Sequence, residues 1–273
     1  MKKGNLWMFD RFDRNINYLR ISVTDRCNFR CTYCMPVEGV PSMHHEDILR
    51  YDEIIEVVKV AVDFGINKVR ITGGEPLVRK GVVSLVEMIA AIPEIRDLSM
   101  TTNGVLLERY ARELKNAGLQ RVNVSLDTLD PVRYHDITRL GDIDQVIRGI
   151  DAAVAAGLAP VKINCVVRNS PDEPDAQMVG EFGKRKGLEV RYIQEMDLDT
   201  GYFRGVIGGD GGNCPICNRL RLTSNGLIKP CLFSNSGYSV RELGPRNAIE
   251  RALQNKPECG SVNTTGEFYN LGG

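Results

Sequence analysis

Six of the eight cysteines in this chain form two groups with metal-ligand spacing. The first triad has the pattern C-x3-C-x2-C and consists of Cys27, Cys31 and Cys34; the second has the pattern C-x2-C-x13-C and consists of Cys214, Cys217 and Cys231. Thiolates suit zinc and iron–sulfur clusters, and three of them leave one position of a tetrahedral ion or of a four-iron cluster open. Two open metal sites in one chain predict an enzyme.

The elements that must position these cysteines follow a βα rhythm from residue 18 to residue 195. We expect strands at Tyr18–Thr24, Lys68–Thr72, Asp97–Thr101, Arg121–Leu126, Val161–Val167 and Glu189–Gln194. Apolar residues at helical spacing predict helices at Tyr51–Phe64, Gly81–Ile92, Leu107–Ala117, Ile143–Ala156 and Asp175–Lys186. No G-x-G-x-x-G turn of a Rossmann sheet is present. We therefore predict an α/β fold, an incomplete (β/α)6 TIM-type barrel with a C-terminal extension that binds the second metal group.

The rhythm stops after residue 196. Residues 201–213 are rich in glycine, the second triad follows, and Pro245–Asn255 is the one short helix that we expect in this part. We assign residues 1–196 to the partial barrel. We assign residues 197–273 to a segment that binds the second cluster and closes the barrel.

In a barrel of this kind the chemistry gathers where the strands end at their carboxyl side. The first triad follows the first expected strand, and Gly73-Gly74-Glu75-Pro76 follows the second. A structural zinc ion would need a fourth ligand, for which His44 or His45 is near the first triad and Cys259 is near the second. We favour iron–sulfur clusters, because an open coordination position is useful on a catalytic face.

Composition and charge exclude several classes of partner. Lys plus Arg and Asp plus Glu both number 35, so no overall field would attract a nucleic acid or an anionic membrane. No apolar run reaches the roughly 18 residues that a spanning helix needs, and the charged start is not followed by a signal-peptide core. We expect a cytoplasmic protein whose cysteines bind metal rather than form disulfides.

One segment together with one loop resembles a known family. The segment is Tyr18-Leu-Arg-Ile-Ser-Val-Thr-Asp-Arg-Cys-Asn-Phe-Arg-Cys-Thr-Tyr-Cys34, and with Gly73-Gly74-Glu75-Pro76 it resembles the radical S-adenosylmethionine enzymes. Within them the chain resembles the GTP 3′,8-cyclases of molybdenum cofactor biosynthesis, from about residue 9 to 196, from 214 to 234 and at the last residues. The resemblance implies that the first triad holds a 4Fe-4S cluster whose open iron binds S-adenosylmethionine, which is then cleaved to a 5′-deoxyadenosyl radical.

The same resemblance assigns residues to the cofactor. It implies contacts with S-adenosylmethionine by Tyr33, Gly74, Glu75, Ser125 and Met196. From packing alone, Tyr33 would be a loop residue and Met196 a core methionine.

The second triad resembles the C-terminal cluster motif of the cyclases. The resemblance implies a second 4Fe-4S cluster whose open iron binds the purine base of GTP. Arg219 and Arg221 are two residues apart, so on a strand both would leave the same face and could bind phosphate oxygens together. The implied substrate-binding residues are Arg20, Arg70, Thr101, Lys162, Arg219 and Arg221, and the implied catalytic residues are Arg219, Arg221, Gly272 and Gly273.

The implied reaction converts GTP to 3′,8-cyclo-7,8-dihydro-GTP and needs a reducing electron donor. Contact with the next enzyme of the pathway and a homodimer are left open as partners. The chain departs from the family between Met196 and Cys214, where it has only residues 197–213 and so less wall around the substrate. Two alternatives are a radical enzyme of the same fold that acts on a peptide or another small molecule, and a non-catalytic metal-binding module.

Overall fold

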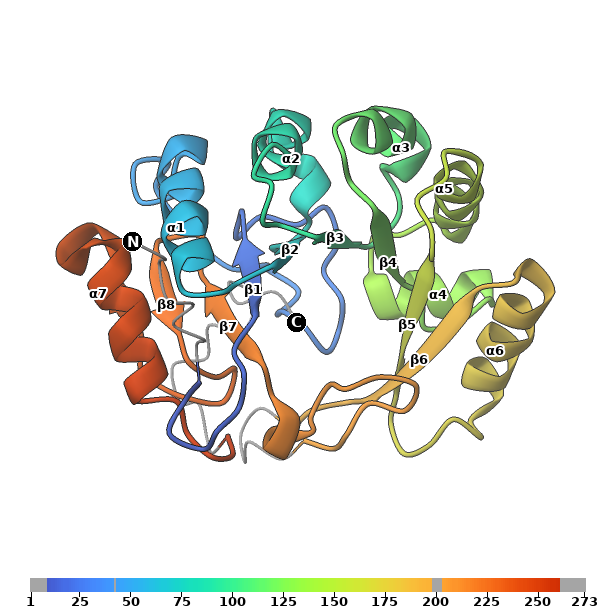
Figure 1. The fold of residues 1–273 in the computed structure, drawn as a ribbon. Helices are drawn as coiled ribbons and strands as arrows, with labels where there is room; N and C mark the ends of the chain where they lie inside the picture. The colour runs from blue at the N-terminus through green and yellow to red at the C-terminus, as the bar shows by residue number, and fades with distance from the viewer. Residues whose placement is uncertain (1–8, 42, 198–202, 261–273) are drawn as a thin grey trace.

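Six parallel strands follow one another along a curved sheet in the computed structural model, which describes residues 9–41, 43–197 and 203–260 (Figure 1). They are β1 Tyr18–Ser22, β2 Lys68–Thr72, β3 Asp97–Thr102, β4 Arg121–Ser125, β5 Lys162–Val167 and β6 Glu189–Gln194. The helices between them are α1 Tyr51–Asp63, α2 Val82–Ala90, α3 Leu107–Asn116, α4 Pro131–Thr138, α5 Ile143–Ala155 and α6 Pro174–Lys186, with a 3-10 turn η1 at Pro76–Val78. The predicted incomplete (β/α)6 barrel is confirmed.

The C-terminal part adds three strands to the same sheet. Strand β7 (Arg219–Leu222) follows a 3-10 turn η2 (Cys214–Ile216) and pairs in parallel with β1, while β8 (Leu227–Lys229) and β9 (Tyr238–Ser239) continue antiparallel. The strand order is β6-β5-β4-β3-β2-β1-β7-β8-β9, so the described strands form no closed ring. The predicted boundary at residue 196 stays a prediction, and β7 extends the barrel sheet itself.

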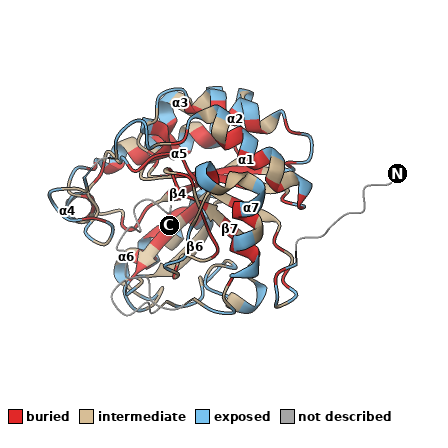
Figure 2. Cartoon of the chain, turned by 90° about the vertical axis from the view of Figure 1, so that its left-hand side faces the viewer, coloured by how far each residue is buried: buried red, intermediate tan, exposed pale blue. Residues whose placement is uncertain are grey.

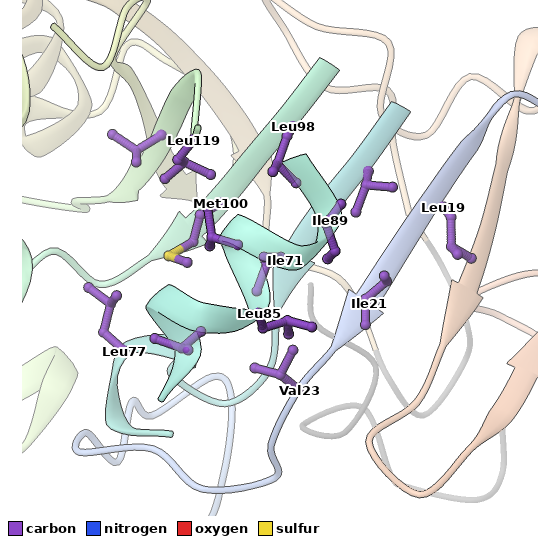
Figure 3. Close-up of a cluster of buried hydrophobic side chains, with 14 of the residues drawn as sticks. Leu19, Ile21, Val23, Ile71, Leu77, Leu85, Ile89, Leu98, Met100 and Leu119 are labelled. Carbon is purple, nitrogen blue, oxygen red and sulfur yellow. The ribbon is translucent and has the colours of Figure 1, made fainter. Parts of the chain in front are cut away.

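The two faces of the sheet differ in chemistry because strand residues alternate. Leu19 and Ile21 of β1 are buried and belong to the same apolar core as Leu85 and Ile89 of α2 (Figure 3). Tyr18 and Arg20, which alternate with them along β1, line a cavity on the inner side. The apolar core therefore lies between the sheet and its helices (Figure 2), and the inner face of the barrel is left polar.

Two helices differ from the sequence-based expectation. Helix α4 was not predicted; it begins at Pro131 behind Asp130, whose carboxylate accepts from Arg133 N. Helix α7 (Val240–Gln254) begins earlier than expected, but Gly244 interrupts it with a non-helical φ of 73° and ψ of 154°, so its second segment corresponds to the expected helix from Pro245.

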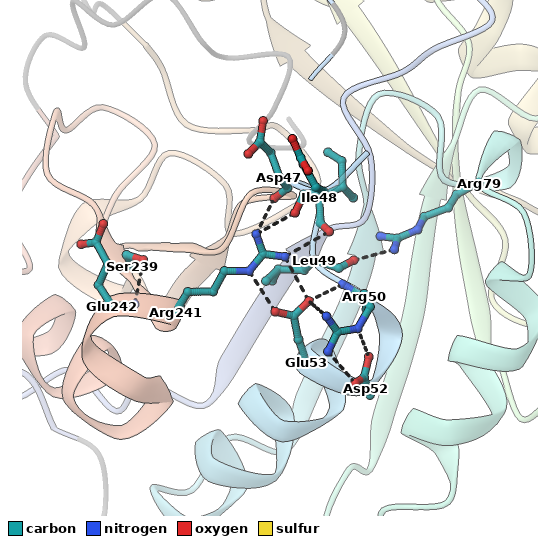
Figure 4. Close-up of polar contacts among 11 residues, drawn as sticks. Asp47, Ile48, Leu49, Arg50, Asp52, Glu53, Arg79, Ser239, Arg241 and Glu242 are labelled. Atoms are coloured by element: carbon teal, nitrogen blue, oxygen red, sulfur yellow. Dashed lines mark hydrogen bonds and ion pairs between the residues drawn. The ribbon is translucent and has the colours of Figure 1, made fainter. Parts of the chain in front are cut away.

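Helix α7 is fastened beside α1 by Arg241. Its guanidinium donates to both carboxylate oxygens of Glu53 in α1, at 2.9 and 3.1 Å, and to backbone carbonyls of residues 46–48 (Figure 4). Arg246 adds an ion pair to Asp63 at 3.1 Å. Among the described residues, no helix combines the length and apolar character that a bilayer crossing requires.

Candidate active site

The two cysteine triads lie at opposite ends of the barrel strands. The first triad follows the carboxyl end of β1, whereas Cys214 and Cys217 come just before the amino end of β7. Strands β1 and β7 are parallel and in register, with Tyr18 opposite Arg219. Strand β8 runs back antiparallel to β7, and it returns Cys231 to the end where Cys214 and Cys217 lie. The inner face of the barrel therefore separates the triads.

The loop of the first triad is held by the carboxyl end of α4. Arg139 has a φ of 64° and donates to the carbonyls of Arg30 and Met35 at 2.8 and 3.0 Å. The backbone N–H groups of Arg30 and Thr32 donate to the last carbonyls of α4. The helix that the sequence pattern did not predict is thus the one that shapes the cysteine loop.

Burial controls the protonation of the first triad. It raises the pKa of Cys27 to about 11 and the pKa of Cys31 to about 12, and it also raises the pKa of Cys34. Thiols of this kind release their protons when a soft metal group binds them. Within the described ranges, no three His, Cys, Asp or Glu side chains are arranged around a single metal ion. The donor set, three thiols with one position open, fits a four-iron cluster.

The Gly73-Gly74-Glu75-Pro76 loop lies directly against the strand end that carries the first triad. Gly74 N donates to Thr24 O and Glu75 N to Arg26 O, both at 2.8 Å. A Cβ at Gly74 would lie 2.3 Å from Arg26 O, so only glycine fits there. This explains the glycine by the close approach of two loop backbones.

The Glu75 side chain joins two loops. It is 1% exposed and accepts from Leu77 N, Thr102 Oγ1 and Asn103 N at 3.0, 2.8 and 2.7 Å. Burial raises the pKa of Glu75 to about 7. Its contact with S-adenosylmethionine stays a prediction, and the contacts above assign its carboxyl group to positioning the loops after β2 and β3.

The half-buried Tyr33 and the buried Asp127 form a pair between the first triad and the end of β4. The Tyr33 hydroxyl donates to Asp127 Oδ2 at 2.7 Å, and Asp127 Oδ1 accepts from Val166 N at 2.8 Å. Burial raises the pKa of Asp127 to about 6. Ser125 ends β4 nearby in the chain, and Met196 lines the cavity after β6. The cofactor roles of Tyr33, Ser125 and Met196 stay predictions.

A cavity of about 310 Å³ occupies the inner side of the barrel. All three cysteines of the second triad line it, and so does Met196. Its basic lining residues are Arg20, Lys68, Arg70, Arg121, Lys162, Arg191, Arg204, Arg219, Arg221 and Lys256. The lining carboxylates among the described residues are Asp97 and Asp210, so the cavity carries a strong positive excess.

Three of the predicted arginines lie side by side on neighbouring strands of the sheet and form one row across it. In the register of the parallel strands, Arg20 of β1 is opposite Arg70 of β2 and opposite Arg221 of β7. Burial, followed by the charge of Arg221, lowers the pKa of Arg20 well below its usual value, and burial with the charge of Arg219 lowers the pKa of Arg221. Guanidinium groups that line one cavity side by side suit an anionic ligand, because they can donate charge-assisted hydrogen bonds to it together.

Of the remaining predicted substrate residues, Lys162 lines the cavity and Thr101 is not among its lining residues. Lys162 begins β5 and pairs with Glu189 at the start of β6, which places it at the amino ends of the strands. The Thr101 hydroxyl is buried with no hydrogen-bond partner among the described residues, as are Tyr18 OH and Arg191 Nε. Gly272 and Gly273 lie outside the described residues.

Several cavity residues were not predicted, among them Tyr18, Lys68, Arg121 and Lys256. The Tyr18 ring lies 5.6 Å from the Arg70 guanidinium and 5.9 Å from that of Arg219. Tyr18 and Lys68 lie two positions before Arg20 and Arg70 on the same strands, so strand alternation could have indicated them. Lys256 follows a helix at the far end of the chain, where a lysine is usually exposed, and no local signal marks it.

Lys256 is a buried cation inside the second triad. It is 1% exposed, and its Nζ donates to Arg219 O at 2.8 Å, to Pro230 O at 2.7 Å and to Cys217 Sγ at 3.5 Å. The two carbonyls belong to the residues that follow the Cys217 turn and precede Cys231. Lys256 therefore links the two segments that carry the second triad.

Comparisons with known proteins agree with this arrangement. The Radical SAM superfamily profile matches residues 21–179, which is more than half of the chain. The chain is 42% identical to a GTP 3′,8-cyclase of Thermodesulfovibrio yellowstonii, over 94% of this chain and 97% of the relative. It is also 42% identical to a GTP 3′,8-cyclase of Petrotoga mobilis, over 92% of this chain and 94% of the relative.

Solved structures show the same fold at low sequence identity. Streptococcus suis SuiB bound to S-adenosylmethionine matches with a TM-score of 0.60 and 16% identity, over 94% of this chain and 70% of that one. The protein described as native anSMEcpe with bound AdoMet matches with a TM-score of 0.64 and 18% identity, over 88% of this chain and 81% of that one. Because 42% identity extends over nearly the whole length of the first relative, the chain belongs to the Radical SAM superfamily and, within it, to the GTP 3′,8-cyclase family.

Proposed function

We propose that this protein is a GTP 3′,8-cyclase that converts GTP to 3′,8-cyclo-7,8-dihydro-GTP, the first step of molybdenum cofactor biosynthesis. The observation that carries the proposal is the cationic cavity on the inner side of the barrel, which the second triad lines. The row of arginines that crosses β2, β1 and β7 suits a triphosphate, which is the most highly charged part of GTP.

The first triad is the site of the radical chemistry. Cys27, Cys31 and Cys34 would hold a 4Fe-4S cluster, and with S-adenosylmethionine this group supplies a 5′-deoxyadenosyl radical. Around it, the glycine loop brings backbone groups close to the triad and Glu75 fixes that loop to the next one. The Tyr33–Asp127 pair fixes the cysteine loop to the end of β4. These residues would position the cofactor. The two carboxylates among them, Glu75 and Asp127, are buried.

The second triad faces the same cavity as the arginines. Cys214, Cys217 and Cys231 would hold the second 4Fe-4S cluster, and an iron without a protein ligand could bind the guanine base. Arg219 and Arg221 follow directly on β7, so the base and the phosphates would be held by one short stretch of chain. The ribose would then lie between the triads, where the two carbons that become bonded must be held close together.

The short segment 197–213 is compatible with GTP as substrate. The alignment with the Thermodesulfovibrio yellowstonii relative runs over 314 positions, more than the 273 residues of this chain, so this chain lacks residues that the relative has. The described part of the short segment still lines the cavity with Arg204, Val206 and Asp210. A one-electron donor and a cytoplasmic location are part of the proposal, while a homodimer and contact with the next enzyme stay predictions.

The test is an anaerobic reaction of the reconstituted chain with S-adenosylmethionine, a reductant and GTP. We expect 5′-deoxyadenosine and a cyclised nucleotide to form together. Formation of 5′-deoxyadenosine with no change in GTP, at saturating GTP, would contradict the substrate but not the radical chemistry. A reconstituted chain without acid-labile sulfide would contradict both.

A further inference from the structure

Cys259 lies outside both triads but contacts one of their members. Its Sγ is 2.9 Å from Cys214 Sγ, and its side chain is exposed. Two thiolates that share one tetrahedral metal ion at about 2.3 Å each stand about 3.8 Å apart. The observed distance between the two sulfurs is shorter than this. Cys259 therefore contacts the Cys214 sulfur directly and is not spaced as a fourth ligand of a metal ion that Cys214 binds.

Buried contacts fix the approach of these two sulfurs. Arg14 is 6% exposed, and one of its terminal nitrogens donates both to Cys214 O at 2.9 Å and to Glu258 O at 2.8 Å. The other donates to Pro257 O at 2.7 Å and pairs with Asp10 at 2.6 Å. A single guanidinium thus binds the backbone at Cys214 and the backbone just before Cys259.

The segment is also fixed on the side of the cavity. Lys256, three residues before Cys259, is anchored to Arg219 O and Pro230 O. Gly260, the next residue after Cys259, packs so closely that a Cβ there would lie 2.8 Å from Phe233 Cβ and 3.2 Å from Cys231 Sγ. The path of residues 256–260 past the second triad is therefore set by contacts on both sides.

We propose that Cys214 and Cys259 are a redox pair that closes to a disulfide by exchange with a low-molecular-weight disulfide when the second triad holds no metal. The exposed Cys259 sulfur attacks one sulfur of the external disulfide and releases the first small thiol. The Cys214 sulfur then attacks the Cys259 sulfur of this mixed disulfide and releases the second small thiol. One external disulfide is reduced to two thiols, and the two cysteines lose two hydrogens and are oxidised to one disulfide.

The consequence is specific to the second site. The disulfide removes Cys214 from the set of three ligands, so the second triad cannot bind a cluster until the disulfide is reduced. The first triad is at the opposite end of the strands and keeps all its ligands. The pair therefore protects an empty substrate-side site from oxidation beyond the disulfide and makes its loading depend on thiol reductant.

The experiment uses the full chain, freed of metal and reduced, then treated anaerobically with oxidised glutathione, alkylated and digested with trypsin. We expect peptide 205–219 to be linked to peptide 252–273, with fragment ions that place the bond at Cys214. Cys259→Ser should abolish this linked pair. Chain reconstituted with iron and sulfide before treatment should not form it, because Cys214 is then a metal ligand.

Loading of the second site gives an independent measurement. Iron and sulfide added to the oxidised chain should be taken up to one cluster, and a thiol reductant should restore uptake to two. Reduced Cys259→Ser should take up the same amount of iron as the reduced unmodified chain and should not lose uptake after oxidised glutathione. These measurements need no GTP, so they are separate from the test of the cyclase reaction.

Three results would overturn the proposal. One is a stable glutathione adduct on Cys259 with no linked peptide. Another is linkage of Cys259 to Cys217 rather than to Cys214. The third is a lower iron content of reduced Cys259→Ser, which would make Cys259 a metal ligand.

Discussion

Arg20 and Arg221 are opposite each other on the paired parallel strands β1 and β7, and both line the same cavity. Burial, followed by the charge of Arg221, lowers the pKa of Arg20, and Arg70 on the other side of Arg20 extends the row. The barrel interior therefore presents a row of like charges to the cavity, which suits an anionic ligand. This relationship underlies the first prediction.

Replacement of Arg221 by Gln should weaken nucleotide triphosphate binding. The change removes one charge-assisted donor from a buried row, and we expect a loss of about 2–3 kcal/mol, roughly 30- to 150-fold in Kd. The measurement is anaerobic calorimetry with GTP. The effect should be much smaller for guanosine, which has no phosphate.

Arg148→Gln is a matched control for Arg221→Gln. Arg148 forms an exposed ion pair with Glu108 on the outer side of the barrel and should leave GTP affinity unchanged. Equal affinity of Arg221→Gln and the unchanged chain for GTP would mean that the phosphates do not lie along the arginine row.

Cysteine substitutions should separate the two triads. Cys27→Ala should abolish cleavage of S-adenosylmethionine, because it removes a ligand at the carboxyl end of β1. Cys231→Ala should leave measurable cleavage uncoupled from GTP, because its loop lies at the opposite end of the strands. The measurement is 5′-deoxyadenosine formed per nucleotide consumed. Complete loss of cleavage in both variants would argue against separate roles for the triads.

Lys256→Met should lower the stability of the second site. The variant leaves the carbonyls of Arg219 and Pro230 without their buried donor, at a cost on the order of 2 kcal/mol. Urea denaturation of the metal-free chain measures it. Lys115→Met removes an exposed lysine bond to Gly157 O and should cost less than about 0.5 kcal/mol. A similar midpoint for both variants would mean that Lys256 does not join the two cysteine segments.

Glu75 should make the protein less stable as pH rises. Its native pKa of about 7 lies above the value of 4.5 for a free glutamate, so the folded state binds this proton more tightly than the unfolded state. The contribution is fully favourable below about pH 4.5 and decreases as pH rises to about 7, by on the order of 3 kcal/mol.

The measurement for Glu75 is the difference in unfolding free energy between the unchanged chain and Glu75→Gln from pH 5 to pH 8. We expect the unfolding free energy of the unchanged chain to decrease relative to that of Glu75→Gln as pH rises. Glu87→Gln, an exposed change on α2, should show no such trend. A flat difference for Glu75→Gln would mean that this carboxyl titrates alike in the folded and unfolded states.

The barrel strands could be predicted because each carries its own signal. Lys68–Thr72 and Glu189–Gln194 were predicted with the observed bounds, and Gly65 and Gly187, which follow their helices, have positive φ. Arg219 and Arg221 were predicted to share a strand face, and both line the cavity from β7.

The position of the second triad could not be read from local pattern. It depends on the pairing of β7 with β1, which joins residues about 200 positions apart, as Tyr18 and Arg219 show.

The expectation that polar chemistry gathers at the carboxyl ends of the strands holds for the first triad. Lys162 instead begins its strand and lines the cavity from the amino end. Lys256 has no periodic neighbour that would mark it as buried.

The alternation along β1 has a consequence for how such a protein can diversify. Leu19 and Ile21 pack in the apolar core under the helices, while Tyr18 and Arg20, which alternate with them, line the cavity. Substitutions at the intervening positions can therefore redesign what the chamber accepts while the scaffold stays folded. Selection for new ligands and selection for stability therefore act on different, alternating residues of the same strands.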